Sequence, residues 1–344
     1  MQLLIIGGTQ FVGKSIVEHA IARDHQVTLF NRGRTNPSLF KSVEQIKGDR
    51  ENIEDLSQLK GRKWDAVIDT CGFTPQVVAQ SAELLKDQVH LYCYISTMSV
   101  YKHLTEQDHL TESAEVMTLT EGELQKVTNG MEGRGSNEYY GPLKFHSERA
   151  VTDIMSESRS LLIRPGLIVG PDDPTDRFTY WPVRVKAGGE FIVPEPKEKK
   201  VQFIDVRDLS AWILHMIENH ETGVYHAAGP EQKLTMHNFI QSCQAVLNLE
   251  AEPRWVTESF LLKEQVQPWM EVPLWVPTEG NFGIDCTKAI EKGLKFRAIE
   301  KTIKDTSAWY EARENKELKA GLSFQKESSL LQKINDASVE EPDV

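Results

Sequence analysis

The sequence predicts an α/β fold in which a doubly wound parallel sheet is accompanied by a smaller carboxyl-terminal lobe. A glycine-rich turn follows the first short apolar run, and further apolar runs alternate with segments of helical periodicity. At 344 residues the chain exceeds one ordinary domain. We expect a sheet domain over 1–165 with later returns near 201–229. A substrate-binding lobe is expected mainly over 166–322, and a polar acidic tail over 323–344.

Strands and helices alternate through the first half of the chain. The apolar run Gln2–Ile6 is too short for a helix, and apolar residues recur at helical spacing from Phe11 onward. Further strands are expected at 26–30, Glu44–Lys47, 66–69, 91–95 and 161–164, and helices at Pro75–Leu85 and 140–156. This alternation predicts a parallel sheet covered by helices on both faces.

The second half is less regular. A long polar segment over 102–138 precedes the helix at 140–156, and its length indicates an active-site cover. From Gly166 the pattern loosens into the smaller lobe. The expected returns to the sheet are strands at 202–204 and Gly223–Ala227 and the helix Val206–Glu218 between them. From residue 323 the composition is polar, and we expect the chain to fray there.

The turn after the first strand reads Gly7-Gly8-Thr9-Gln10-Phe11-Val12-Gly13. Gly7 lets the chain turn sharply, Gly13 lets helix and sheet approach closely, and the amides at the helix amino end face a pyrophosphate. The residues expected to contact a dinucleotide are Gly7, Thr9, Gln10, Phe11, Val12 and Gly13. The alternative is a glycine turn with a purely structural role.

The residues after the second strand bear on the choice of cofactor. An acid there would bind both ribose hydroxyls of NAD and repel the phosphate of NADP. This chain has Asn31-Arg32-Gly33-Arg34 instead, and guanidinium groups suit a phosphate monoester. We therefore expect NAD(P), with NADP favoured over NAD, bound by Asn31, Arg32 and Arg34. The alternative is that both arginines are exposed loop charges.

Tyr140 and Lys144 lie four residues apart, and hence on one face of the expected helix. A nearby ammonium would lower the pKa of the Tyr140 hydroxyl. The phenolate could then accept a hydroxyl proton near neutral pH while hydride leaves the same carbon for a nicotinamide. A surface tyrosine and lysine without a catalytic role is the alternative.

These motifs together resemble the extended short-chain dehydrogenase/reductase superfamily of the Rossmann fold, which contains nucleotide-sugar epimerases and dehydratases. Gly7 and Gly13 match the outer glycines of the superfamily's Gly-x-x-Gly-x-x-Gly turn, whereas Gln10 replaces the middle glycine. That departure is expected to crowd the pyrophosphate side. The similarity extends over nearly the whole chain.

The resemblance implies roles for two further residues. The stretch Tyr94-Ile95-Ser96-Thr97-Met98-Ser99-Val100-Tyr101 is similar to the superfamily's fifth-strand end, which implies that Thr97 completes a catalytic Thr-Tyr-Lys triad with Tyr140 and Lys144. Asp49 is similar to the acid that contacts adenine, and Tyr140 and Lys144 would also contact the cofactor. For Asp49 a purely turn-forming role remains the alternative.

Departures from the superfamily pattern bear on the reaction. Met98-Ser99 stands where 4,6-dehydratases have an Asp-Glu pair, which disfavours dehydration by that route. Leu167 and Val201 replace an Asn and an Arg typical of nucleotide-sugar epimerases, so two expected diphosphate contacts are missing or moved, and a substrate other than a standard nucleotide sugar is an alternative. Arg177, Arg184 and Lys200 are the candidate contacts for an anionic substrate, each with a structural role as its alternative.

The resemblance therefore implies an NAD(P)-dependent oxidoreductase or epimerase acting on a hydroxyl or carbonyl carbon of a sugar-like or nucleotide-sugar substrate. One alternative is an NADPH-dependent reductase of a non-sugar small carbonyl compound. Another is a non-catalytic RNA-binding protein, because the glycine turn and the stretch at 27–33 also look like the chloroplast stem-loop RNA-binding proteins.

The composition of the chain disfavours some classes of binding partner and favours others. A net charge of -12 disfavours nucleic acid and anionic membranes, so we expect a small-molecule substrate. No apolar stretch is long enough to span a bilayer and the first strand begins at once, which indicates a cytoplasmic protein. The four cysteines lack metal-ligand spacing, so we expect reduced core residues and no metal.

The resemblance also implies a homodimer, through the helices Pro75–Leu85 and 140–156.

Overall fold

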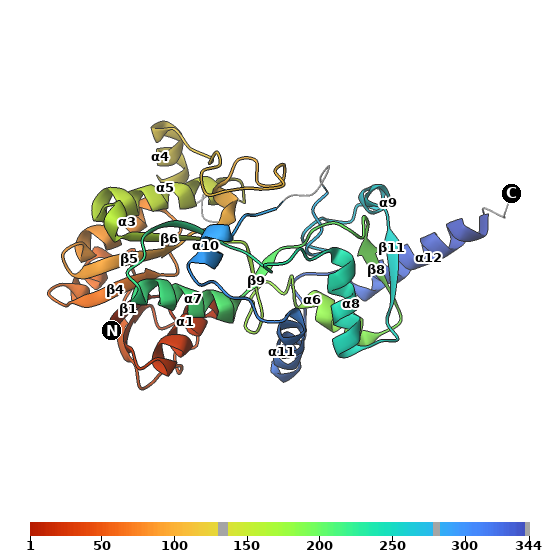
Figure 1. Ribbon diagram of the computed structural model, residues 1–344, viewed down its shortest axis with the longest axis horizontal. Coiled ribbons are helices and arrows are strands. Elements are labelled where there is room, and N and C mark those ends of the chain that lie inside the picture. Colours follow the sequence, from red (N-terminus) through yellow and green to blue (C-terminus); the bar gives the residue numbers. More distant parts are fainter. Residues whose placement is uncertain (130–136, 278–282, 341–344) are drawn as a thin grey trace. The chain divides into compact units, whose positions relative to one another are not determined.

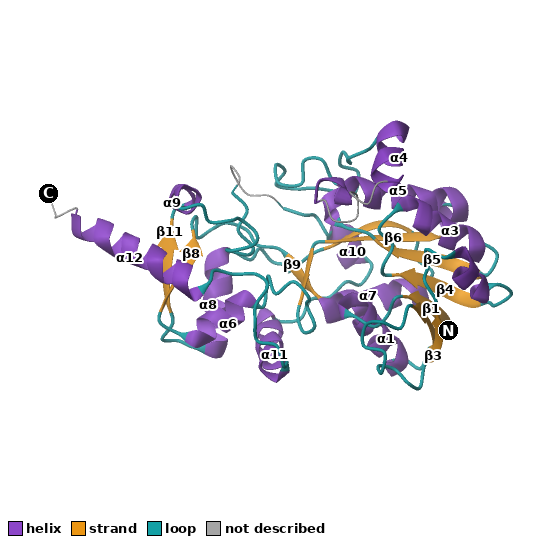
Figure 2. Cartoon of the chain, turned by 180° about the vertical axis from the view of Figure 1, so that it is seen from behind, coloured by secondary structure: helices purple, strands orange, loops and turns teal. Residues whose placement is uncertain are grey.

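The computed structural model describes residues 1–129, 137–277 and 283–340, which fall into two compact units (Figures 1 and 2). The first unit comprises Met1–Ile168, Val206–Gly229 and Phe282–Phe296. The second comprises Val169–Asp205, Pro230–Asn281 and Arg297–Val344. The return of a third stretch, Phe282–Phe296, to the first unit was not expected from the sequence.

The first unit is built on a seven-stranded parallel sheet, as the sequence predicts. Its strand order is β10-β6-β5-β4-β1-β2-β3. The strands are β1 (Gln2–Ile6), β2 (Gln26–Asn31), β3 (Glu44–Lys47), β4 (Trp64–Asp69), β5 (Val89–Ile95), β6 (Ser160–Pro165) and β10 (Gly223–Ala227). Because β1 lies between β2 and β4, the strand order reverses there. The carboxyl ends of β1 and β4 therefore border the crevice in which ligands bind in doubly wound sheets.

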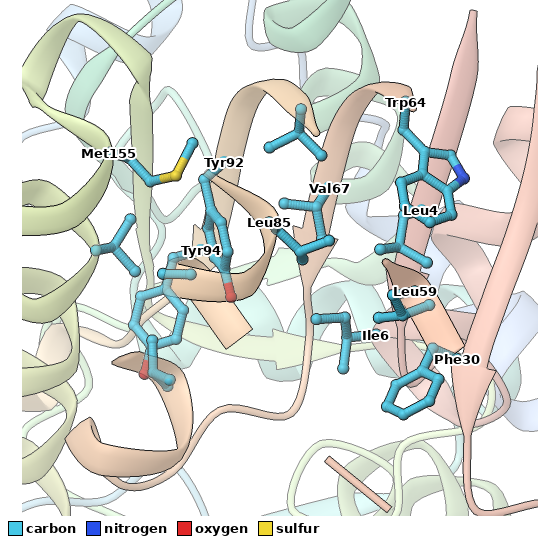
Figure 3. Packing of buried hydrophobic residues seen from close by; sticks show 14 of the residues in the cluster. Leu4, Ile6, Phe30, Leu59, Trp64, Val67, Leu85, Tyr92, Tyr94 and Met155 are labelled. Atoms are coloured by element: carbon cyan, nitrogen blue, oxygen red, sulfur yellow. The ribbon is translucent and has the colours of Figure 1, made fainter. Parts of the chain in front are cut away.

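Helices cover both faces of this sheet. The helices of this unit are α1 (Phe11–Ala22), α2 (Ile53–Leu56), α3 (Pro75–Leu85), α4 (Glu121–Asn129), α5 (Asn137–Met155), α7 (Val206–Glu218) and α10 (Thr287–Glu291), with short 3₁₀ turns η1 (Ser57–Leu59), η2 (Met98–Val100) and η4 (Glu157–Arg159). Helix α1 packs against α7, and α3 packs against α5 (Figure 1). The core between sheet and helices contains Leu4, Phe30, Trp64, Tyr92 and Met155 (Figure 3).

Several expected boundaries differ in the structure. Helix α5 begins at Asn137 rather than at residue 140, so Tyr140 lies inside its first turns. The helix ends at Met155 because Ser156 takes a positive φ of 72°. The strand expected at 202–204 is β9 (Phe203–Asp205), and it lies outside the seven-stranded sheet, as does β7 (Leu167–Val169). The expected cover at 102–138 contains α4, while 130–136 lie outside the described residues.

The second unit combines helices with a parallel strand pair. It contains α6 (Tyr180–Ala187), β8 (Glu190–Pro194), α8 (Met236–Leu247), β11 (Glu252–Val256), α9 (Glu258–Lys263), α11 (Ile299–Ala312) and α12 (Phe324–Glu340), and β8 pairs with β11. Its core is aromatic: the ring centroids of Phe178 and Phe203 lie 5.1 Å apart, and those of Phe203 and Phe239 lie 5.7 Å apart. Edge-to-face packing of this kind stabilises a core beyond the area it buries.

The frayed tail expected from residue 323 is wrong for most of its length, because α12 spans Phe324–Glu340. Two residues hold this helix to its unit. Leu330 is buried, and the buried Glu327 carboxylate accepts hydrogen bonds from Arg184 Nε at 2.6 Å and from the amide of Ile192 at 3.1 Å. The polar composition of this segment therefore did not reveal that α12 has one buried face. Residues 341–344 lie outside the described part.

Within the described residues, no helix has the length and apolar character needed to cross a membrane. All four cysteines are free, as expected. Cys93, Cys243 and Cys286 are buried, whereas Cys71 is partly exposed.

Candidate active site

The glycine turn after β1 is tightly packed and has a backbone conformation that favours glycine. Gly7 and Gly8 have φ values of 105° and 92°, which L side chains rarely adopt. A Cβ on Gly7 would lie 2.5 Å from Thr70 Oγ1, and a Cβ on Gly13 would lie 2.8 Å from the backbone nitrogen of Gly8. These contacts would block any larger residue, so the turn forms a close-packed cradle at the amino end of α1.

The remaining residues of the turn lead into α1, which begins at Phe11 with Gln10 as its N-cap, and their contacts with a dinucleotide remain a prediction. Phe11 and Val12 are half-buried there, and Thr9 is buried with its carbonyl accepting from Asn36 Nδ2 at 2.9 Å. Gln10 is exposed and has a φ of -144°, an extended value open to any residue. The backbone therefore does not require a middle glycine, which explains how this chain departs from the common pattern.

The loop after β2 is attached to the glycine turn by side-chain amides. Asn31 Nδ2 donates to the carbonyl of Gly7 at 3.0 Å, and Asn31 Oδ1 accepts from the amide of Gly33 at 2.8 Å. Together with the Asn36 bond to the Thr9 carbonyl, these contacts fix the loop beside the turn. Asn31 therefore has a structural role, and sequence reasoning missed Asn36.

Arg32 and Arg34 project from this loop and are both exposed. Across the described residues, no carboxylate lies within ion-pair distance of either guanidinium. The stem of Lys47 lies against Gly33, because a Cβ on that glycine would be 3.3 Å from Lys47 Cε. The loop after β2 therefore carries two exposed arginines, and the stem of Lys47, which was not predicted, lies against the glycine between them.

Asp49 shows the turn-forming contact considered as its alternative role. Its Oδ1 accepts from the amide of Glu51 at 3.1 Å, while its own amide donates to Asp55 Oδ2 at 2.7 Å. The carboxylate is half-buried. A contact between Asp49 and adenine remains a prediction.

Thr97 and Tyr140 lie together where β5 ends and α5 begins. Thr97 is 9% exposed, and its Oγ1 accepts from the amide of Ser99 at 3.1 Å as the cap of η2. Tyr140 is 36% exposed. The exposed part is not the hydroxyl, which is largely enclosed by protein atoms. This desolvation raises the pKa of the Tyr140 hydroxyl, and the hydrogen bond between its side chain and that of Thr97 acts in the opposite direction. The structure thus joins these two members of the expected triad.

Lys144 is almost fully buried, with 3% of its surface exposed. Its ammonium donates to the carbonyls of Gly72 at 2.8 Å and Ile95 at 2.6 Å and lies 4.1 Å from the centroid of the Tyr94 ring. Burial lowers the pKa of Lys144 to about 8, although Asp69 and Glu148 oppose that effect. These acceptors hold the ammonium at the carboxyl ends of β4 and β5. An influence of Lys144 on the pKa of Tyr140 remains a prediction.

A buried ion pair supports the loop that binds Lys144, and the sequence analysis missed it. Arg50 contacts Asp69 through two hydrogen bonds of 2.5 and 2.8 Å. Asp69 also accepts from the Tyr92 hydroxyl at 2.9 Å and from the amide of Cys71 at 3.2 Å. Burial opposes the charge on Asp69, but Arg50 and the hydrogen bonds lower its pKa overall. The sequence did contain one indication of this ion pair, because Asp69 is an acidic residue at the end of the largely apolar strand β4.

A second buried network connects α5 with β6 and β10. The Arg164 guanidinium donates to Glu148 at 2.9 and 2.6 Å and to the Tyr101 hydroxyl at 2.5 Å. Tyr101 in turn contacts His226 Nε2 at 2.6 Å, and His226 Nδ1 contacts the carbonyl of Asp285 at 2.8 Å. Since Glu148 follows Lys144 by one helical turn and Tyr101 follows Thr97 by four residues, this network holds both sides of the candidate site.

The candidate substrate contacts belong to the second unit. Arg177 is half-buried, with its guanidinium carbon 5.5 Å from the Trp269 ring centroid and a nitrogen 3.7 Å from Met270 Sδ. Lys200 is half-buried and forms an isolated β-bridge with Thr235. Arg184 is engaged with the buried Glu327, which gives it the structural role considered as the alternative.

Comparisons with known proteins show which family and which solved structures this chain is similar to. The model of the family described as "NAD dependent epimerase/dehydratase family" matches residues 3–228. The chain is 24% identical over 263 residues to the chloroplast stem-loop binding protein of 41 kDa b from Arabidopsis thaliana, a match that covers 70% of this chain. It spans 62% of the length of that relative.

Solved structures share the fold. The UDP-glucuronic acid 4-epimerase from Bacillus cereus, solved in complex with NAD, has a TM-score of 0.65 at 13% identity, covering 91% of this chain and 97% of that one. The UDP-glucose 4-epimerase from Thermotoga maritima, solved with UDP-glucose, has a TM-score of 0.65 at 15% identity, covering 90% and 99%.

Proposed function

This chain belongs to the NAD dependent epimerase/dehydratase family, and from that membership we propose that it is an NAD(P)-dependent epimerase or oxidoreductase acting at a hydroxyl-bearing carbon of a sugar-like substrate. The observation that carries the proposal is the pairing of Tyr140 with Thr97 close to the end of β5, in the unit that also carries the glycine cradle. When bound, a nicotinamide dinucleotide supplies the hydride acceptor or donor.

The chain's own residues provide the proton chemistry. The Tyr140 hydroxyl is the general acid/base that exchanges a proton with the reacting hydroxyl or carbonyl oxygen. Thr97 hydrogen-bonds Tyr140 and helps to hold the reacting oxygen. Lys144, charged and buried between the carbonyls of Gly72 and Ile95, places a positive charge near the site and favours the phenolate.

The cradle fits a dinucleotide, because side chains are excluded at Gly7 and Gly13 and amides at the α1 amino end are available for a pyrophosphate. We further propose that NADP is preferred over NAD. Arg32 and Arg34 are exposed without a carboxylate partner in the described part of the chain, and Lys47 lies beside them. A cluster of cations at the end of β2 suits a ribose phosphate.

We propose a nucleotide sugar as the substrate, with Arg177 and Lys200 of the second unit as contacts for its anionic part. Support comes from the named activities of the structural neighbours and from the geometry of Arg177. That guanidinium is half-buried, stacks on Trp269, and has no carboxylate within ion-pair distance among the described residues.

The experiment incubates the protein and its Tyr140→Phe variant with UDP-glucose or UDP-glucuronic acid and with NAD or NADP. Proton NMR follows inversion at the sugar carbon, and absorbance of the reduced nicotinamide follows net oxidation or reduction. Turnover should fall by a factor on the order of a hundred in the variant, while dinucleotide affinity by calorimetry stays the same. Parental turnover in Tyr140→Phe would remove the central residue from the mechanism.

The similarity to a stem-loop binding protein favours a second candidate, a protein that uses the fold to bind structured RNA. The net charge of -12 argues against a large phosphate-binding surface. A gel shift with a stem-loop RNA at moderate salt separates the two proposals. Tight and salt-sensitive binding without turnover would favour the RNA-binding role.

A further inference from the structure

Gly141, the residue after Tyr140, lies in backbone contact with the turn that carries Thr97. A Cβ at this position would lie 1.9 Å from the carbonyl oxygen of Ser99 and 2.7 Å from Met117 Cε. Contacts this short with a backbone atom cannot be relieved by rotating a side chain. Any residue other than glycine would therefore push the start of α5 away from η2.

We infer that Gly141 is a positioning residue, whose missing side chain brings the hydroxyl of Tyr140 to that of Thr97. The inference rests on the proposed role of Tyr140 and extends it. Thr97 Oγ1 accepts from the amide of Ser99 at 3.1 Å and lies 3.2 Å from Ser99 Oγ, so Thr97 and the Ser99 carbonyl belong to one turn. Separating α5 from that carbonyl separates Tyr140 from Thr97 as well.

The displacement should be local. Lys144 lies one helical turn beyond Tyr140, and its ammonium is held by the carbonyls of Gly72 and Ile95. Glu148, a further turn along, is held by Arg164. A substitution at Gly141 should therefore move Tyr140 much more than Lys144, and the dinucleotide cradle at Gly7 should stay as it is.

The test measures the ionisation of Tyr140 in Gly141→Ala without any substrate. The full chain is labelled with fluorotyrosine, whose phenol titrates at lower pH than tyrosine, and fluorine NMR follows each tyrosine. The resonance of Tyr140 is the one missing from Tyr140→Phe. Because the bond to Thr97 lowers the pKa of Tyr140, its loss should shift the Tyr140 titration to higher pH in Gly141→Ala.

Two further variants show whether the effect passes through Thr97. Gly122→Ala is the matched control, since Gly122 also lies in a helix but a Cβ there would meet nothing within 4 Å. It should leave the titration unchanged. In a Thr97→Val background, which already lacks the hydroxyl, Gly141→Ala should produce little additional shift.

If Gly141→Ala does not fold, the double variant with Met117→Ala removes the side-chain part of the clash and lets the helix shift. A folded variant whose Tyr140 titrates as in the parent would overturn the inference. An equal shift with and without the Thr97 hydroxyl would also overturn it, because the effect would then not pass through that bond. Neither result bears on turnover in Tyr140→Phe, so failure here is distinct from failure of the proposed function.

Discussion

Lys144→Met should change how the stability of the protein depends on pH. Lys144 is 3% exposed, and burial lowers the pKa of its ammonium from 10.5 to about 8 against the opposing effects of Asp69 and Glu148. The unfolded chain therefore binds this proton more tightly than the folded chain does. Between those two pKa values, folding releases the proton, and the free energy of unfolding rises as pH rises.

The size of the effect follows from the two pKa values. One unit of difference corresponds to about 1.4 kcal/mol. Integrating the linkage relation between about pH 8 and about pH 10 gives a gain of about 2 kcal/mol for the parent relative to Lys144→Met. Below about pH 8 the difference should be nearly constant, because both states then hold the proton. The constant part includes the loss of the two hydrogen bonds that Lys144 donates to the carbonyls of Gly72 and Ile95, of which the Gly72 carbonyl keeps its bond from the Tyr94 hydroxyl.

Urea unfolding of the parent and Lys144→Met at several pH values measures the difference, and taking the difference cancels other titrating groups. Lys126→Met is the control, because Lys126 is an exposed lysine on α4. Its difference from the parent should not vary with pH. A difference between parent and Lys144→Met that stays constant up to about pH 10 would refute the argument that burial disfavours the charged form.

Two other substitutions test the cofactor loop and the buried ion pair. Arg32→Ala should weaken NADP binding by roughly tenfold to a hundredfold while leaving NAD binding nearly unchanged, because only NADP carries the added phosphate. Calorimetry with both dinucleotides measures the two affinities. An unchanged ratio of NADP affinity to NAD affinity would contradict the prediction. Asp69→Asn should lower the free energy of unfolding by about 3–5 kcal/mol, because Arg50 stays buried beside a neutral amide. Asp153→Asn, at an exposed ion pair, is the control and should have almost no effect.

The local parts of the site were predictable from the sequence. The first strand, the glycine turn and α1 are consecutive, so the run from Gln2 to Gly13 predicts all three elements, whereas a dinucleotide bound at the turn stays a prediction. The loop after β2 is equally local. Alternating apolar runs predicted the parallel sheet because each buried strand carries its own pattern. The spacing of Tyr140 and Lys144 likewise indicates one helical face.

Contacts between distant segments were decided only by the tertiary structure. The Arg50–Asp69 pair, the carbonyls that receive Lys144, and the contact of Gly141 with Ser99 join residues that no local pattern connects. The polar composition of the segment also did not indicate α12, in which the buried Glu327 contacts Arg184 and Leu330 is buried. Sequence periodicity records which face of an element is buried, but it does not record which partner buries it. The sequence alone therefore predicted the sheet, the glycine turn and the candidate acid/base Tyr140. Tertiary packing decided the burial and the contacts that shift the pKa values of Tyr140 and Lys144.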